Sequence, residues 1–414
     1  MIINNTKREI SSGVYIFISI LTLSLNALLF IPLIIKGIIT KQKSTPLFTA
    51  IFFSLISYYF IPPEEFDLYR HYESFEYFSL NSEPLHKLKD LYLLSLFNIG
   101  EYLNIKKEFL YATSVIIYYY IITSVLISLL KINNIRDKKL ILILSFLYLF
   151  SNTLVEISGL RFTTGLAFSI LFLHKYFIVK NKKISIYIYM LLAILSHFSL
   201  IIIPITILIY KLFYKLFFDK KFSIFLLFFT LLLGLFFIND LISILIINVE
   251  DITGLYIGAE AYTNGAWGVN RLDIQKYNST GFFVEKSKLY ITILISLIIS
   301  ILLIFSKENY LNSLSKYLIL LTSISFLLTN FDTIYFRYQS LLTIITLMII
   351  TTNKINYKKL NSGSIILILL YIKTLHQFSL GFISTYLNYL SGISYIDVIN
   401  NSNVISFFIY IFNF

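Results

Sequence analysis

Arginine is the residue type whose scarcity first points to chemistry in this chain. Only six of the 34 basic residues are arginine: Arg8, Arg70, Arg136, Arg161, Arg271 and Arg337. A guanidinium group is planar and always charged, and it holds a phosphate through two parallel hydrogen bonds, whereas lysine offers a point charge. Arg161 and Arg337 each stand beside an apolar segment, close after an acid. In one interpretation, each arginine pairs with that acid or extends to the membrane interface. In the other, the two arginines together hold an anionic head group, most readily a diphosphate.

Histidine supplies the second candidate chemistry, because a neutral imidazole can take a proton from a hydroxyl group near pH 7. His197 lies within an apolar stretch, in the sequence Ser196-His197-Phe198. It is either a structural histidine with satisfied hydrogen bonds or a catalytic base, since ionisable groups inside membrane segments tend to be functional. His71 is a competing candidate for the base.

His71 belongs to a short segment, residues 62–72, that is rich in polar side chains. Its sequence is Pro62-Pro63-Glu64-Glu65-Phe66-Asp67-Leu68-Tyr69-Arg70-His71-Tyr72. One interpretation is structural: the prolines end one helix, and the acids favour the first turn of the next. The other interpretation is a substrate-binding segment in which Asp67 contacts sugar hydroxyls or acts as a base.

Lys373 and His376 form a third, weaker signal. They stand three residues apart in an apolar segment, so they share one helix face that we expect to point into the protein. They could bind substrate or pair with a buried acid. Cysteine is absent, and the chain has no phosphate-binding glycine loop, HExxH, EF-hand or nucleophile-elbow motif. We therefore expect neither a cofactor nor a metal ion.

Membrane helices must position these residues. Of the 414 residues, 57% are hydrophobic and 14% are charged, which excludes a soluble enzyme, a disordered chain and an ordinary nucleic-acid-binding protein. The apolar residues come in runs of about 17–25, the length that spans a bilayer, and they lack the alternation of an outer-membrane barrel. The predicted fold is all-α: a polytopic membrane helix bundle of about 11–13 segments in a single transmembrane domain, residues 1–414. The predicted spans are residues 14–35, 46–61, 110–130, 139–155, 162–180, 222–247, 288–306, 314–330, 335–352 and 364–383, while residues 403–414 end the chain before a full crossing.

The formal net charge of +12 is mainly a signal of orientation. Six connections hold 20 of the 34 lysines and arginines but only three acids: residues 36–45, 131–139, 175–183, 211–221, 307–316 and 354–359. Such an excess marks the cytoplasmic side of a membrane protein. Arg161, Arg337 and the segment 62–72 then lie on the external side.

Three regions depart from simple spans. Residues 184–214 have predicted cytoplasmic lysines at both ends, which indicates a broken or re-entrant helix pair bent at residues 196–198. Non-helical backbone at that depth must be covered by protein or line a wet cavity, so we expect His197 at a cavity. Residues 62–109 and 248–287 are large external loops, and loops of this length seldom lack a function.

Three stretches give the chain a resemblance to a known family. They are Asp67-x-x-Arg70-His71-Tyr72; Leu160-Arg161-x5-Ala167 followed by Tyr176, lysines and Ala193-x-Leu195-Ser196-His197-Phe198-Ser199; and Phe336-Arg337-Tyr338. The combination resembles the Wzy-type O-antigen and capsular polysaccharide polymerases, especially the EpsG-like branch. One departure is that Pro63, Glu64, Glu65 and Phe66 stand where many EpsG-like chains have an arginine and a glycine before the aspartate.

The resemblance implies a GT-C-like polymerase in the bacterial inner membrane, with its active site facing the periplasm. It would transfer a growing glycan from undecaprenyl diphosphate to another lipid-linked repeat unit, without a nucleotide or metal. The implied partners are the undecaprenyl-diphosphate-linked oligosaccharide, the lipid bilayer and a chain-length regulator, and no nucleic acid. In this assignment Arg161 and Arg337 hold the diphosphate, and His197 is the leading base. Loop 248–287 forms a lid or acceptor channel, and the substrate-binding residues are Asp67, Arg70, His71, Tyr72, Arg271, Lys373 and His376.

Three other functions stay open. A GT-C glycosyltransferase that uses polyprenyl-linked sugars commonly has an acidic pair in its first external loop, which Glu64, Glu65 and Asp67 could supply, and often needs a divalent cation. An O-antigen ligase differs from a polymerase in its acceptor. A flippase or transporter also fits the helix count and the broken segment 184–214. Against it, most polar residues gather on one face and do not follow a path through the membrane.

Overall fold

The computed structural model describes residues 11–58, 60, 62, 64, 66–81, 91–181, 183–236, 279–306, 313–353, 361–389 and 403–406. In these residues every regular element is a helix, which confirms the all-α class. The chain divides into two compact units, which we describe separately. Unit 1 is Met1–Leu171 with Gln377–Phe414, and unit 2 is Phe172–His376. Two helices contribute residues to both units, α9 (Leu160–Leu173) and α19 (Ser362–Tyr389).

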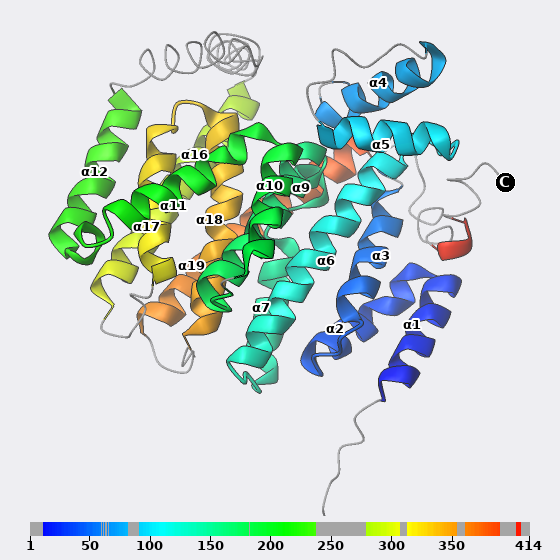
Figure 1. The fold of residues 1–414 in the computed structure, drawn as a ribbon, viewed down its shortest axis with the longest axis horizontal. Helices are drawn as coiled ribbons and strands as arrows, with labels where there is room; N and C mark the ends of the chain where they lie inside the picture. Colours follow the sequence, from blue (N-terminus) through cyan, green and yellow to red (C-terminus); the bar gives the residue numbers. More distant parts are fainter. Residues whose placement is uncertain are drawn as a thin grey trace, which may run out of the picture. The chain divides into compact units, whose positions relative to one another are not determined.

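Unit 1 begins with a series of helices (Figure 1). In chain order these are α1 (Ser12–Leu25), the 3₁₀-helix η1 (Ala27–Phe30), α2 (Ile31–Ile39), α3 (Thr45–Ser57), α4 (Asp67–Asn81), α5 (Leu91–Tyr102), α6 (Phe109–Ile132), α7 (Lys138–Phe150) and α8 (Leu154–Ile157).

Helix α6 packs along α3 in unit 1 (Figure 1). The ring of Phe53 in α3 stacks on that of Tyr119 in α6, with the ring centroids 3.7 Å apart and the planes 6° from parallel. Near the C-terminal end of α6, Lys41 Nζ donates a hydrogen bond to the carbonyl oxygen of Leu130 at 2.9 Å. The lysine thereby satisfies one of the carbonyl groups that a helix end leaves without an intrahelical partner.

The first predicted span, residues 14–35, is not one continuous helix. Helix α1 ends at Leu25, and Asn26 is extended, with φ −164° and ψ 130°. The Asn26 side-chain oxygen accepts a hydrogen bond from the Leu28 N–H at 2.9 Å and so caps η1. Asparagine caps helices well because its side chain replaces a missing backbone acceptor. The prediction overlooked this break because apolar residues surround the single asparagine.

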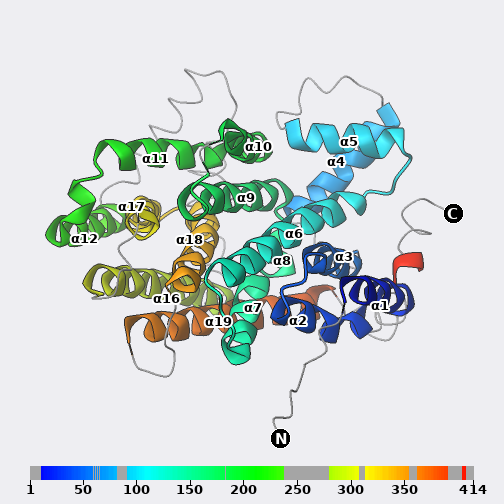
Figure 2. The ribbon, with the colours of Figure 1, turned by 60° about the horizontal axis from the view of Figure 1, so that its bottom comes forward.

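Unit 2 contains the remaining described helices (Figure 2). They are the π-helix η2 (His174–Ile178), η3 (Ile184–Ile186), α10 (Tyr187–Ser196), η4 (Phe198–Ile201), α11 (Ile202–Leu212), η5 (Leu216–Phe218), α12 (Lys220–Phe236), α16 (Ser279–Phe305), α17 (Ser313–Leu327), α18 (Asp332–Thr352) and the first part of α19.

Four helices, α12, α16, α17 and α18, share an apolar core in unit 2 (Figure 2). Its buried residues are Leu227, Leu289, Ile293, Ile304, Ile319, Phe326 and Tyr335. The close approach of α12 to α17 depends on Gly234, because a Cβ atom there would lie 1.9 Å from the carbonyl oxygen of Phe326. That oxygen belongs to the backbone of a helix end, so it cannot rotate away as a side chain would.

Alanine in place of Gly234 is therefore expected to destabilise unit 2 by roughly 1–3 kcal/mol, the usual range for overpacking. Thermal unfolding of the purified variant would show this as a lower Tm. Gly13→Ala is the matched control, since a Cβ atom at Gly13 meets nothing within 4 Å. The close packing is contradicted if the two variants unfold at the same temperature.

Three described helices are long and apolar enough to cross a membrane: Phe109–Ile132, Lys286–Phe305 and Ile334–Thr352. Six shorter apolar helices have 10–17 residues: Ser12–Leu25, Ala27–Ile39, Thr45–Ser57, Ile184–Ser196, Phe198–Leu212 and Ser313–Leu327. These helices support a helical membrane protein. The full set of about 11–13 segments stays a prediction.

Candidate functional site

The described part of the first predicted external loop, residues 62–109, is largely helical. Helix α4 begins at Asp67, and α5 follows at Leu91–Tyr102. Pro62 is buried before α4, and Asp67 occupies the first turn, where a carboxylate interacts favourably with the helix dipole. Asp67 thus fits the structural interpretation, whereas the preceding helix α3 already ends at Ser57, before the prolines. The functional interpretation stays open because α4 still presents polar side chains.

Helix α4 has a buried apolar face. Leu68, Tyr72 and Phe75 recur at helical spacing and are at most 5% exposed. The ring centroid of Phe75 lies 5.4 Å from that of Phe97 in α5 and 5.7 Å from that of Phe109 in α6. Burial raises the pKa of Tyr72 well above its ordinary value, and the charge of a nearby glutamate adds to this. Tyr72 is therefore a packing residue, and its contact with substrate stays a prediction.

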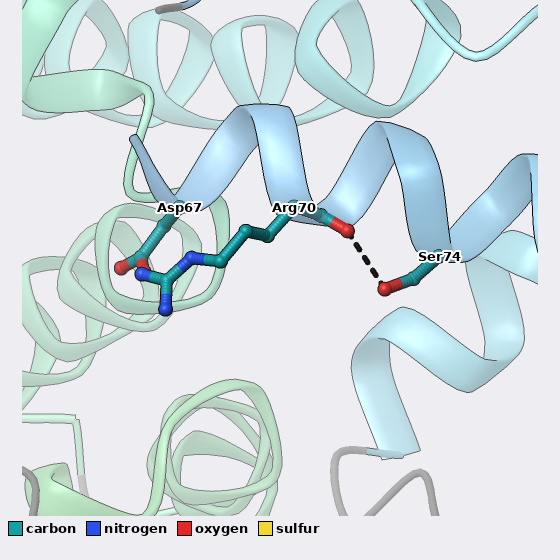
Figure 3. Close-up of polar contacts among 3 residues, drawn as sticks. All are labelled: Asp67, Arg70 and Ser74. Carbon is teal, nitrogen blue, oxygen red and sulfur yellow. Dashed lines mark hydrogen bonds and ion pairs between the residues drawn. The ribbon is translucent and has the colours of Figure 1, made fainter. Parts of the chain in front are cut away.

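The other side of α4 is polar, and Figure 3 shows three of its residues. Nη2 of Arg70 forms an ion pair with Oδ1 of Asp67, one turn earlier. Ser74 Oγ donates a hydrogen bond to the carbonyl oxygen of Arg70 at 2.7 Å. The Arg70 side chain is 47% exposed, so a ligand can reach the guanidinium. Exposed ion pairs contribute at most about 1 kcal/mol, so a stronger anion can displace the carboxylate.

His71 on α4 lies within electrostatic reach of Arg161, which occupies the first turn of α9. Burial lowers the pKa of His71 to about 4; the charges of Arg161 and Arg70 also lower it, and that of Asp67 raises it. The imidazole is therefore neutral at pH 7, within the electrostatic reach of two guanidinium groups and one carboxylate. The structure thus brings together four of the predicted site residues, which we call the α4–α9 cluster: Asp67, Arg70, His71 and Arg161.

Two sets of hydrogen bonds position the start of α9. In α8, Glu156 Oε2 accepts from the Thr153 N–H at 2.8 Å, and Thr153 Oγ1 accepts from the Glu156 N–H at 3.4 Å, which is a capping box. In α9, Thr164 Oγ1 donates to the Tyr92 hydroxyl at 3.1 Å, and that oxygen lies 2.9 Å from Ser114 Oγ. The sequence contains the Thr-x-x-Glu pattern of a capping box. From the sequence, however, Glu156 is expected only to pair with Arg161, because it stands shortly before that arginine.

The low pKa of His71 predicts a pH dependence of stability. An unfolded histidine titrates near 6.5 and folded His71 near 4, so between these values the unfolded state binds more protons. The free energy of unfolding is expected to fall as the pH is lowered from about 6.5 to about 4. Denaturant unfolding at several pH values would measure this, and the slope should be shallower in His71→Gln. An identical slope in both proteins would contradict the low pKa of His71.

In unit 2 a helix break surrounds His197. Helix α10 ends at Ser196, His197 is extended with φ −155° and ψ 115°, and η4 follows. The predicted break at residues 196–198 is therefore present, and α10 and α11 lead away from it in different directions (Figure 2). Whether the pair re-enters a membrane stays a prediction.

The hydrogen bonds of His197 bear on its chemistry. Its Nδ1 accepts a hydrogen bond from the Ser199 N–H at 3.3 Å, and Ser199 Oγ lies 2.7 Å from the same nitrogen. A backbone N–H can only donate, so we infer that the proton of the neutral imidazole is on Nε2. In this tautomer Nε2 is a hydrogen-bond donor. The role of His197 as a general base stays a prediction, and the geometry favours donation to an oxygen.

Arg337 lies on the segment of α18 that contacts this break. The Tyr338 hydroxyl donates to the carbonyl oxygen of Ser199 at 2.9 Å, which joins α18 to η4. Phe336 precedes Arg337 in the chain, and Lys288 Nζ lies 4.8 Å from its ring centroid. Lys288 is not among the predicted site residues, because in the sequence it resembles the ordinary flanking charge of an apolar span.

Lys373 belongs to a small polar cluster in unit 2. It is 4% exposed, and its Nζ donates to Thr343 Oγ1 at 2.8 Å and to Gln339 Oε1 at 3.3 Å. Ser296 Oγ donates to the same Gln339 oxygen at 2.7 Å. The adjoining cavity of about 10 Å³ has room for roughly one water and none for a sugar. The geometry favours a structural role for Lys373, and substrate contact by Lys373 and His376 stays a prediction.

The predicted diphosphate pair is divided between the units, with Arg161 in unit 1 and Arg337 in unit 2. Arg271 and most of the second external loop, residues 248–278, lie outside the described residues, while residues 279–287 form the start of α16. Within the described residues, no three His, Asp or Glu side chains form a group that could hold a metal ion.

Comparison of the chain with protein-family models, curated proteins and solved structures finds no match. Functional interpretation therefore depends on the residues and their geometry.

Proposed function

We propose that the chain is a polysaccharide polymerase of the bacterial inner membrane, resembling the Wzy-type enzymes, with its active site on the periplasmic face. Its remaining predicted spans would complete a GT-C-like bundle. It would transfer a growing glycan from undecaprenyl diphosphate to the non-reducing end of another lipid-linked repeat unit. One observation carries the proposal: the α4–α9 cluster combines two guanidinium groups suited to a diphosphate with a neutral imidazole suited to a hydroxyl proton.

The proposed reaction exchanges a glycosyl–phosphate bond for a glycosidic bond. The bond between the glycan's anomeric carbon and the diphosphate oxygen breaks, and the acceptor hydroxyl oxygen bonds to that carbon. The hydroxyl proton passes to His71. The diphosphate leaves with its negative charge, which Arg161 and Arg70 stabilise at the point where the charge develops. The donor bond is already activated, so the reaction needs no nucleotide.

Substrate binding would itself make His71 a better base. In the free protein, after burial, the positive charge of Arg161 is the largest contribution to its low pKa, and Arg70 adds to it. A diphosphate held by these arginines would offset their charges and raise the pKa of His71 towards 6.5. A catalytic base is most effective when its pKa lies near the working pH. The imidazole would therefore become more basic only when the donor is bound.

Unit 2 contains a separate group of hydrogen-bond donors. The Nε2–H of His197 and the guanidinium of Arg337 belong to segments that the Tyr338–Ser199 hydrogen bond joins. We propose that this group, within unit 2, binds phosphate or sugar oxygens of a lipid-linked substrate.

The deciding experiment is the surface-polysaccharide profile of a strain that lacks this chain. A polymerase predicts loss of the long ladder and accumulation of single-repeat glycan. A ligase instead predicts polymer that stays on its lipid carrier, and a flippase predicts loss of both. An unaltered ladder would reject the proposal. Purified protein that elongates lipid-linked repeats without an ion gradient excludes a transporter, and a ladder that persists with a chelator excludes a cation-dependent GT-C enzyme.

A further inference from the structure

Unit 2 contains a pocket that none of the proposed site residues lines. Its volume is about 600 Å³, within the range of small-molecule binding sites. Four tyrosines and two lysines dominate its lining: Tyr176, Tyr187, Tyr210, Tyr214, Lys180 and Lys211. Both lysines belong to connections that the charge distribution predicts to be cytoplasmic, which is the side opposite the proposed active site.

The wall of this pocket has unusual backbone. It includes part of η2, and π-helical turns are rare and often occur at functional sites. The chain leaves η2 through Lys180, whose φ of 53° is left-handed. The Asn181 N–H then donates to the carbonyl oxygen of Lys175 at 3.0 Å, which ends the helix with a turn that usually contains glycine. A lysine at this position places a cation at the pocket.

Tyr210 gives an independent indication of a ligand. The residue is 5% exposed, and its hydroxyl has no hydrogen-bond partner among the residues that the structure describes. Nearly all buried polar groups have a partner, because leaving one unsatisfied is costly. Tyr210 lines the pocket, so an oxygen of a bound molecule could supply the missing bond. Nearby, Lys211 Nζ lies 5.4 Å from the ring centroid of Tyr176, a cation–π contact that directs the amine.

We propose that this pocket binds the phosphate of an anionic phospholipid from the cytoplasmic leaflet. Lys180 and Lys211 bind the phosphate, and the Tyr210 hydroxyl bonds to a further oxygen of the head group. Lysine binds phosphate well as a point charge, and tyrosine favours the membrane interface. The cytoplasmic leaflet is the negatively charged one, and basic pockets between membrane helices on that side suit anionic head groups. This inference does not depend on the proposed polymerase activity.

Native mass spectrometry of the purified full chain with added phosphatidylglycerol or phosphatidylcholine tests the proposal. We expect phosphatidylglycerol to bind more tightly. The double variant Lys180→Gln/Lys211→Gln should bind it about tenfold or more weakly, because two charge-assisted hydrogen bonds are lost. Tyr210→Phe, which removes a single oxygen, should weaken binding about two- to tenfold. The matched control is Lys220→Gln/Lys221→Gln, which removes the same charge from two exposed lysines at the start of α12.

Three results would overturn the proposal. The control double variant could lose as much binding as the pocket double variant, which would show non-specific charge attraction. Tyr210→Phe and Lys180→Gln/Lys211→Gln could both bind normally, which would show that lipid sits elsewhere; unchanged Tm values would establish that these variants are folded. Glycerol 3-phosphate could compete at the same concentration as the lipid. This last result would exclude a lipid as the ligand and assign the pocket to a soluble phosphate ester.

Discussion

Alanine in place of Arg161 is expected to abolish the long polysaccharide, with glycan transfer slowed by about 10²–10³-fold. This is the range seen when one preorganised donor to a developing negative charge is removed. Arg70 could not compensate, because its side chain is 47% exposed and already forms an ion pair with Asp67. The substitution should also raise the pKa of His71, since the charge of Arg161 lowers it in the native protein.

Two measurements test this expectation. The transfer rate is measured with purified protein and lipid-linked repeat units, and the His71 titration is followed by NMR. Arg136→Ala is the matched control, because Arg136 is exposed on a predicted cytoplasmic connection and bonds to Asn134. Arg161→Lys should be intermediate, since it retains the charge but not the two-pronged geometry. A normal ladder from Arg161→Ala at normal protein levels would contradict the site.

The second large effect separates the two histidines. His71→Asn removes the proposed base and should lower kcat by about 10²–10⁴-fold. His197→Asn should retain much more activity, because asparagine can accept the Ser199 N–H bond through its side-chain oxygen and is itself a good helix cap. His197→Phe, which can neither accept nor donate, should lose both the cap and the activity. If His197 were the base, His197→Asn would be the less active of the two variants.

The pH dependence of the reaction provides a further test of the same assignment. A base must be unprotonated, so activity falls as the pH drops below its pKa. In the free protein the pKa of His71 is about 4, and the low-pH limb of kcat/KM should appear there. The low-pH limb of the kcat profile reports the pKa of His71 in the substrate complex. It should lie at higher pH, because the bound diphosphate offsets the arginine charges. Coincident limbs would exclude activation of His71 by substrate.

Helix class and one helix break could be predicted from the sequence. Apolar runs without alternation can form only helices in a membrane, and His197 interrupts such a run between two groups of lysines. Asn26 also interrupts an apolar run, yet its break was not predicted. The difference is that asparagine can also occupy the interior of a helix, so its presence alone does not predict a break. Only the hydrogen bond from the Leu28 N–H to the Asn26 side chain shows that α1 has ended.

The residue types of the site could be predicted, but not their grouping. Arg161 and Arg337 resemble each other in sequence, each following an acid beside an apolar segment, which suggested that they act as a pair. The structure places Arg161 within electrostatic reach of α4 residues far earlier in the chain, and its pairing with Arg337 stays a prediction. That arrangement depends on how α4 packs against α5 and α6. It requires Gly100, where a Cβ atom would lie 2.4 Å from the ring of Phe109. Sequence spacing contains no such information.

The ion pair between Asp67 and Arg70 has a consequence for selectivity. Without a ligand the Arg70 guanidinium is already satisfied by an internal anion, so an incoming group must replace that anion and not merely approach a bare cation. A neutral sugar cannot make this exchange, and a monoanion gains little from it. A diphosphate, with more charge and more acceptor oxygens, can displace the carboxylate. The ion pair would thus select ligands by the amount of negative charge they carry.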